Sequence, residues 1–236
     1  MMKNVSAVIV VGRESRPLKS PKQLLPFGDT TVLGRTLRAY LTAGVQEVIL
    51  VLSSRAPEIR EGLGDLAGKV KIVSIDAAPS EFGAFLKAGV GAVASSAKAI
   101  AVGLGDQPLL DGPIIDRLSE AFAAGKKKIM VPVAQGQMGL PFFLDPSLAA
   151  EVEKLGPTDD AWDLLRKHAD EVHDFHIYET SIARTIDDMD DYHTLLTLAG
   201  LPIPEPTPHG DESHEPKSAA TDGAATTYHS HSLEQG

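Results

Sequence analysis

The chain has 236 residues, of which 43% are hydrophobic, so it can bury one good core. Its formal net charge of -10 argues against nucleic acid and anionic membrane surfaces as partners, because both select for basic protein surfaces. The sequence contains no cysteine, which excludes disulfides, thiolate metal sites and cysteine nucleophiles. No stretch reads as a signal peptide or reaches membrane length, so we expect a cytoplasmic protein.

The first predicted strand covers residues 5–11, a near-continuous apolar run typical of a strand that is covered on both faces. It leads into a loop that begins at Gly12 and ends at Lys22. Loops after the first strand of an open α/β sheet bind nucleotides, and cationic side chains there neutralise phosphate oxygens. The alternative is a solvated basic loop. The cations of this loop are Arg13, Arg16, Lys19 and Lys22.

Helical and strand patterns alternate along the rest of the chain up to about residue 201. Helices are predicted over residues 32–43, 58–66, 81–93, 114–124, 146–155, 160–168 and 190–198. Further strands are predicted over residues 47–52, 70–75, 99–104, 129–133, 142–144, 172–178 and 185–188. This alternation indicates βαβ units, and hence a three-layer αβα, Rossmann-like domain over residues 1–201 with a mainly parallel sheet.

The strand predicted over residues 99–104 ends on a carboxylate, Asp106. Gly105 lets the backbone turn sharply, and Pro108 prevents the strand from continuing. Because open α/β sheets bind ligands at the carboxyl ends of their strands, Asp106 is placed where a metal ion or a phosphate would bind. The alternative is that Asp106 is an ordinary turn residue.

The composition changes at residue 202. Residues 202–236 are rich in proline, small and polar residues and hold half of the eight histidines. We expect this tail to be disordered, because it has too few large apolar side chains to fold. Weak metal binding by the tail histidines is the alternative reading.

Two motifs together resemble the molybdenum-cofactor cytidylyltransferase branch of the NTP transferases with a glycosyltransferase-A-like fold. One is the glycine loop that ends in Lys22 and continues as Gln-Leu-Leu-Pro-Phe-Gly; the other is the strand end Gly-Asp-Gln-Pro-Leu that contains Asp106. The resemblance covers about residues 5–200. It implies the sheet type of the nucleotide-diphospho-sugar transferases.

The resemblance also implies roles for individual residues. Gly12, Arg16 and Lys22 would bind the triphosphate together with Arg13 and Gly105, and Arg16, Lys22 and Asp106 would act in catalysis. Asp106 and Asp187 would hold Mg²⁺, and Gly139 and Pro141 would lie near the acceptor. Val11 stands where the family's base-selecting residue lies, and its bulk favours CTP over a purine nucleotide. Asp191 matches the family's closing motif, as Asp187 does.

The expected reaction is therefore transfer of a nucleoside monophosphate, CMP from CTP, to a phosphorylated acceptor of the molybdopterin type, with release of pyrophosphate. A molybdoenzyme is the partner protein that the resemblance implies. Two alternatives stay open: a nucleotide-binding homologue that lacks turnover and serves as a partner or regulator, and a different transferase on the same fold.

Overall fold

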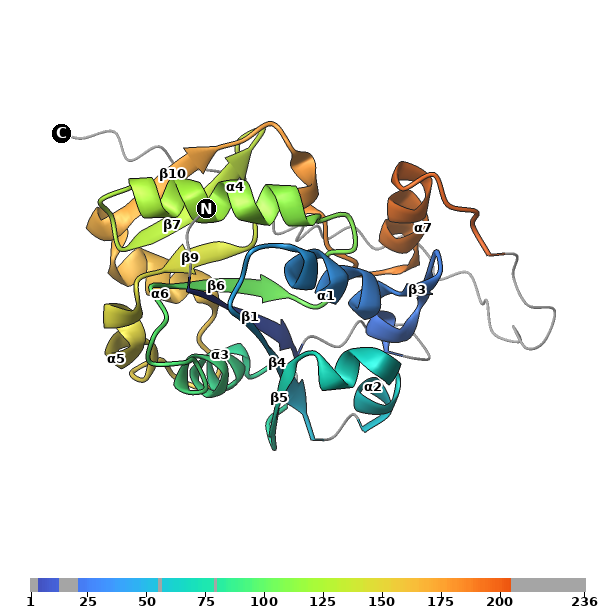
Figure 1. The fold of residues 1–236 in the computed structure, drawn as a ribbon, viewed down its shortest axis with the longest axis horizontal. Helices are drawn as coiled ribbons and strands as arrows, with labels where there is room; N and C mark the ends of the chain where they lie inside the picture. Colours follow the sequence, from blue (N-terminus) through green and yellow to red (C-terminus); the bar gives the residue numbers. More distant parts are fainter. Residues whose placement is uncertain (1–3, 13–20, 55–56, 79, 205–236) are drawn as a thin grey trace, which may run out of the picture.

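The computed structural model describes residues 4–12, 21–54, 57–78 and 80–204. Its centre is a mainly parallel sheet in the order β10-β7-β9-β6-β1-β4-β5, with β8 paired to β7 (Figure 1). The strands are β1 (Val5–Val11), β4 (Glu47–Ser53), β5 (Lys71–Ile75), β6 (Ala99–Leu104), β7 (Ile129–Ala134), β8 (Gln137–Met138), β9 (Phe142–Leu144) and β10 (Val172–His176). The expected fold class is confirmed.

β1 is the central strand, and all seven of its residues are buried. It pairs in parallel with β4 on one side and β6 on the other, so that Val8 faces Ile49 and Val102 across the ladders. β9 is antiparallel to both β6 and β7, and β8 is antiparallel to β7. The carboxyl ends of β1, β4, β5, β6, β7 and β10 therefore lie along one edge of the sheet.

Helices cover both faces of the sheet, as Figure 1 shows. α1 (Val32–Thr42) and α4 (Gly112–Ala124) pack on one face, in a core cluster that includes Leu37 and Leu118. α3 (Phe82–Gly91), α5 (Ala149–Val152) and α6 (Ala161–Lys167) pack on the other face, in a cluster that includes Leu86 and Leu164. α2 (Pro57–Glu61) and the 3-10 turns η2 (Gly64–Gly68), η3 (Pro146–Leu148) and η4 (Ala169–Glu171) complete the connections.

Side-chain caps fix where the helices begin. The Thr31 hydroxyl accepts a hydrogen bond from the Gly34 backbone N–H at 3.0 Å and so caps the N-terminus of α1. Asp111 caps α4 in the same way, and Asp160 forms a capping box with Asp163 at the start of α6.

A third, small apolar cluster joins segments that are far apart in the sequence. The short hairpin of β2 (Pro26–Phe27) and β3 (Thr30–Thr31) packs against α7 (Met189–Leu198) through Phe27, Tyr192 and Leu196. The Tyr192 hydroxyl donates a hydrogen bond to the Pro26 carbonyl. This cluster holds the C-terminal helix beside the segment that begins at Lys22 and runs into the hairpin.

Three of the predicted elements differ from the structure. The helix predicted over residues 58–66 is divided into α2 and η2, because Gly64 adopts φ +51°. Residues 146–155 form η3 followed by the short α5, not one helix. Residues 185–188 are not a strand: Asp188 caps α7, and the Ile186 carbonyl accepts a side-chain hydrogen bond in place of a strand partner.

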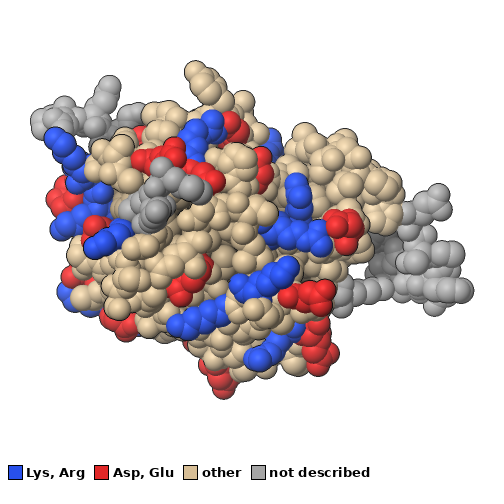
Figure 2. Space-filling view, in the orientation of Figure 1, with Lys and Arg blue, Asp and Glu red and all other residues tan. Residues whose placement is uncertain are grey.

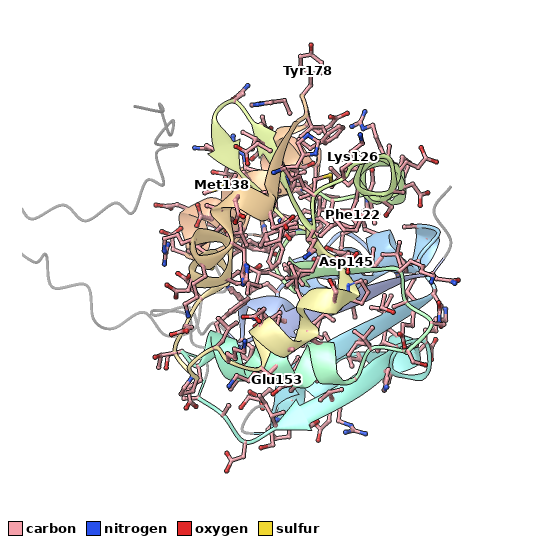
Figure 3. All side chains as sticks on the ribbon, turned by 90° about the vertical axis from the view of Figure 1, so that its left-hand side faces the viewer. Phe122, Lys126, Met138, Asp145, Glu153 and Tyr178 are labelled. Atoms are coloured by element: carbon pink, nitrogen blue, oxygen red, sulfur yellow. The ribbon has the colours of Figure 1, made fainter. Side chains whose placement is uncertain are left out.

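Acidic and basic side chains are interspersed over the face that Figure 2 shows. Tyr178, which follows β10, is 98% exposed and projects away from the body of the protein (Figure 3). Within the described ranges, none of the helices is both long enough and apolar enough to cross a bilayer. The tail from residue 205 onward lies outside the described residues.

Two buried tyrosines should respond in opposite directions to the loss of their hydroxyl groups. The Tyr40 hydroxyl is buried against Gly103 without a hydrogen-bond partner among the described residues, and its burial raises the pKa of Tyr40. An unsatisfied buried hydroxyl costs about 1–3 kcal/mol, so Tyr40→Phe should raise the free energy of unfolding by about 1 kcal/mol.

Tyr192→Phe is the matched control. It removes the hydrogen bond to the Pro26 carbonyl and should lower the free energy of unfolding by about 1 kcal/mol. Urea denaturation of the two variants measures both changes, and a loss of stability in Tyr40→Phe would contradict the packing described.

Candidate functional site

A buried lysine occupies the centre of the candidate site. Lys22 begins the 3-10 turn η1 (Lys22–Leu24), and its side chain is only 2% exposed. Its Nζ lies 2.5 Å from Asp106 Oδ2 and 3.6 Å from Asp187 Oδ1, and it donates a hydrogen bond to the Ile186 carbonyl. The structure thus brings together three of the residues that the sequence singled out, Lys22, Asp106 and Asp187.

A tight corner after β6 presents Asp106. The Gly105 backbone N–H donates to the Val10 carbonyl at 3.0 Å, so the corner is tied to the end of β1. A Cβ at position 105 would lie 2.5 Å from Val11 Cγ2 and 3.0 Å from Leu33 Cδ1, too close for any side chain. Gly105 is therefore required for the close packing of this corner, which turns the Asp106 side chain toward Lys22.

Gln107 links the corner to two other segments. Its side chain is fully buried; Nε2 donates to the Ile182 carbonyl at 3.0 Å and lies 3.5 Å from the Leu140 carbonyl. The Leu104 backbone N–H approaches Oε1 at 3.5 Å. Sequence reasoning missed this residue, since a glutamine in a predicted turn does not by itself indicate a buried link between segments. It connects β6 to the turn η5 (Thr180–Ala183), which precedes Ile186.

Asp187 lies on the short segment between η5 and α7, and its side chain is 60% exposed. Asp191 Oδ2 accepts hydrogen bonds from the backbone N–H groups of Asp187 at 2.8 Å and Asp188 at 3.3 Å. Asp188 in turn caps α7 by accepting from the Asp191 N–H at 2.9 Å. Asp191 therefore holds the Asp187 backbone in place, within a capping box.

Val11 and Gly12 lie at the end of β1, and both make packing contacts. The Val11 side chain is 4% exposed and belongs to the same core cluster as Leu33. A Cβ at position 12 would lie 3.2 Å from the ring of Phe85, which is fully buried in α3. Packing therefore accounts for both residue types. Arg13 and Arg16, the other predicted phosphate ligands, lie outside the described residues.

Gly139 and Pro141 lie on the connection from β8 to β9, beside Gln107. The Gly139 N–H donates to the Pro132 carbonyl at 2.8 Å, and a Cβ there would lie 2.7 Å from the Ile182 side chain. The Leu140–Pro141 peptide bond is cis, and the Leu140 N–H donates to the Ile182 carbonyl at 2.8 Å. These contacts place the predicted acceptor turn next to the Asp106 corner.

A cavity of about 360 Å³ opens beside the same end of β6. It lies between residues 102–104 and the first residues of α3 and α6. Its apolar wall includes Phe82, Leu140 and Trp162, and its polar lining consists of Ser80, Thr158 and Asp160. A largely apolar cavity with a few polar groups is the usual form of a site for an organic ligand.

The oxygen atoms around Lys22 Nζ suit a divalent metal ion. Two carboxylates and the Ile186 carbonyl are hard oxygen ligands of the kind that Mg²⁺ prefers. The Lys22 ammonium group lies among them, where a metal ion could bind. In the described part of the chain, no cluster of three or more His, Cys, Asp or Glu side chains forms a metal site. Mg²⁺ commonly binds one or two carboxylates and completes its shell with water and substrate phosphates.

Comparison with known proteins identifies a family. The model for the MobA-like NTP transferase domain matches residues 7–172. Among curated proteins, the bifunctional protein GlmU of Kineococcus radiotolerans is 28% identical over 131 residues, which are 55% of this chain. The matched region spans only 27% of that relative.

Solved structures agree with the observed fold. A homologue of Rv0371c from Mycobacterium sp. strain JC1 is 29% identical with a TM-score of 0.73, over 83% of this chain and 96% of that chain. Rv0371c from Mycobacterium tuberculosis, in a complex with manganese, is 27% identical with a TM-score of 0.71, over 83% of this chain and 99% of that chain.

Two glycine substitutions should have opposite effects on stability, because one glycine lies in the crowded corner and the other at an open position of a helix. Gly105→Ala forces a methyl group against Val11 and Leu33, so we expect it to lower the free energy of unfolding by about 1–3 kcal/mol. Gly91→Ala, at the end of α3, places its methyl group in open space and should raise that free energy by about 0.5–1 kcal/mol. Urea denaturation measures both; equal effects of the two substitutions would mean that the corner is not crowded.

Proposed function

We propose a function from the premise that the chain belongs to the MobA-like NTP transferase domain family. The protein transfers a nucleoside monophosphate from a nucleoside triphosphate to a phosphorylated acceptor and releases pyrophosphate. The observation that carries this proposal is the convergence of Lys22, Asp106 and Asp187 at the carboxyl edge of the sheet. A buried cation beside two carboxylates can serve both the phosphates and the metal ion of a metal–triphosphate complex.

The reaction needs positioning and charge neutralisation more than a base. An oxygen of the acceptor phosphate forms a bond to the α-phosphorus, and the bond between that phosphorus and the bridging oxygen of the β-phosphate breaks. The acceptor oxygen is already anionic, so no proton has to be removed. Catalysis then depends on holding both phosphates in line and on stabilising the charge on the leaving pyrophosphate.

The residues divide these tasks. The Lys22 ammonium would bind triphosphate oxygens together with Arg13 and Arg16, and the backbone at Gly12 and Gly105 would lie next to these oxygens. Asp106, Asp187 and the Ile186 carbonyl would hold Mg²⁺. When bound, Mg²⁺ supplies neutralisation of the phosphate charge. Asp191 acts indirectly, because it fixes the Asp187 backbone.

The cavity beside β6 is the space for the organic part of a substrate. Gly139 and Pro141 lie on the turn that carries Leu140, one of its apolar lining residues. We propose an acceptor of the molybdopterin type, CTP as the donor and a molybdoenzyme as the protein that takes up the product; these assignments rest on the sequence motifs.

A second candidate function follows from the position of Phe85. Its buried ring fills the space beside Gly12, at the start of the loop that is expected to bind the triphosphate. The second candidate is a homologue that binds a nucleotide at this loop without turning it over. The assay below separates the two functions, because only an enzyme releases pyrophosphate.

Asp106→Asn should lower the rate of turnover sharply. The substitution removes the buried carboxylate charge, and loss of a group that stabilises charge in the transition state costs about 2.7–4 kcal/mol, or a rate about 10²–10³-fold lower. Pyrophosphate release with Mg²⁺, CTP and a phosphorylated pterin acceptor measures the rate, and circular dichroism checks the fold.

Asp29→Asn is the matched control, since Asp29 is exposed and pairs with Arg38 on the surface at 2.8 Å. It should keep the wild-type rate. Wild-type turnover in Asp106→Asn would remove Asp106 from the mechanism, and absence of pyrophosphate release from the wild-type protein with any of the four triphosphates would favour the second candidate function.

CTP should bind more tightly than GTP. The expected preference is about 10- to 200-fold, the range that steric exclusion by one or two methyl groups achieves. Competition calorimetry with the wild-type protein in Mg²⁺ measures it, and UTP serves as a pyrimidine control. Equal affinity for CTP and GTP would show that Val11 only packs in the strand.

A further inference from the structure

The most unusual feature of the site is that its cation is part of the chain. Lys22 Nζ is surrounded by Asp106 Oδ2, Asp187 Oδ1 and the Ile186 carbonyl oxygen, which we call the oxygen cage. Asp106 comes from the corner after β6, whereas Ile186 and Asp187 come from the segment before α7. Two carboxylates and a carbonyl form the ligand set of a hard divalent cation, but here they bind an ammonium group.

The ammonium and a metal ion compete for the same atoms. Asp106 Oδ2 lies 2.5 Å from Nζ, and a Mg²⁺ ion bonds carboxylate oxygens at about 2.0–2.1 Å. A divalent ion bonded to this oxygen would be repelled by the positive charge of Nζ. The side chains of Lys22 and Asp106 are both almost fully buried. Water screens such repulsion poorly in a buried site, so each cation weakens the binding of the other.

We propose that the Lys22 ammonium occupies the divalent-cation site of the ligand-free protein, and that a triphosphate opens this site by drawing the ammonium away. This inference rests on the proposed function, because it takes the oxygen cage as the metal site. Neither ligand completes the exchange alone. Either ligand by itself would break the buried pair of Lys22 and Asp106 and would replace only one of the two partners.

Together, the two ligands keep every charge paired. The phosphates bind the Lys22 ammonium, which is carried by a flexible side chain at the end of the loop predicted to bind the triphosphate. The metal ion binds the carboxylates. The metal ion and the triphosphate therefore bind cooperatively, and each raises the affinity of the other by the same factor. The consequence for the enzyme is that free metal ions do not hold the site in the absence of a nucleotide.

Calorimetric titration of the protein with Mn²⁺ tests this competition without any measurement of activity. The wild-type protein should bind Mn²⁺ weakly, and more tightly in a saturating concentration of inorganic tripolyphosphate. Lys22→Gln removes the ammonium, and we expect it to bind Mn²⁺ without tripolyphosphate about 5- to 150-fold more tightly than the wild type, the usual range for coupled ligands. Mn²⁺ should also raise the melting temperature of this variant more than that of the wild type.

Three further variants control the result. Lys22→Arg keeps a positive charge in the cage and should bind Mn²⁺ as weakly as the wild type. Lys154→Gln removes an exposed lysine that pairs with Glu151 at 2.7 Å and should change nothing. The double variant Lys22→Gln/Asp106→Asn should lose the increase in Mn²⁺ affinity seen in Lys22→Gln. That loss would locate the tighter Mn²⁺ site at the oxygen cage.

Each outcome separates this inference from the proposed function. Equal Mn²⁺ affinity in Lys22→Gln and the wild type overturns the competition, and so does a wild-type protein that binds Mn²⁺ as tightly alone as with tripolyphosphate. That second measurement decides the matter even if Lys22→Gln fails to fold. If no Mn²⁺ binds under any of these conditions, the metal-dependent function itself is wrong.

Discussion

The buried ion pair between Lys22 and Asp106 is the constraint on which the rest of the site depends. The side chains of Lys22 and Asp106 are only 2% and 5% exposed. Such buried charges need partners that are held in place, because loss of one member of the pair leaves the other charge uncompensated. Several unrelated features serve this need. The glycine corner fixes Asp106, the turn η1 fixes Lys22, and Asp191 fixes the backbone beside Ile186. The small cluster around Tyr192 then holds these segments against one another.

Much of the fold could be predicted from the sequence, because its central strands are continuous apolar runs. Residues 5–11 and 99–103 are buried, and short continuous apolar runs of this kind are typical of strands that are covered on both faces. The shared edge of the parallel strands then places the ends of both strands together, which is why Asp106 could be assigned a ligand-binding position. The hairpin of β2 and β3 could not be predicted, since strands of two residues carry no periodicity.

The candidate site was only partly predictable, for reasons that lie in its atoms. Ile186 contributes a backbone carbonyl, and because every residue has one, the sequence cannot show which carbonyl will bind an ammonium group. The strand predicted over residues 185–188 was wrong for a related reason. An isoleucine between polar residues gives the alternating pattern of a strand, but among the described residues the Ile186 carbonyl binds Lys22 and no strand lies beside it. Gly12 shows the opposite difficulty: close packing against Phe85 and close approach of a phosphate both favour glycine, so the residue type alone could not separate the two roles.

The contact between Lys22 and Ile186 spans 164 positions of the sequence, and it has a consequence for the order of folding. During synthesis the N-terminal strands and the Asp106 corner leave the ribosome well before residues 186–196 exist. Non-local contacts of this separation form late, because the entropy of closing the loop must be overcome before they stabilise anything. The nascent chain therefore pairs its N-terminal strands before it forms its oxygen cage, and the lysine becomes buried only when α7 docks.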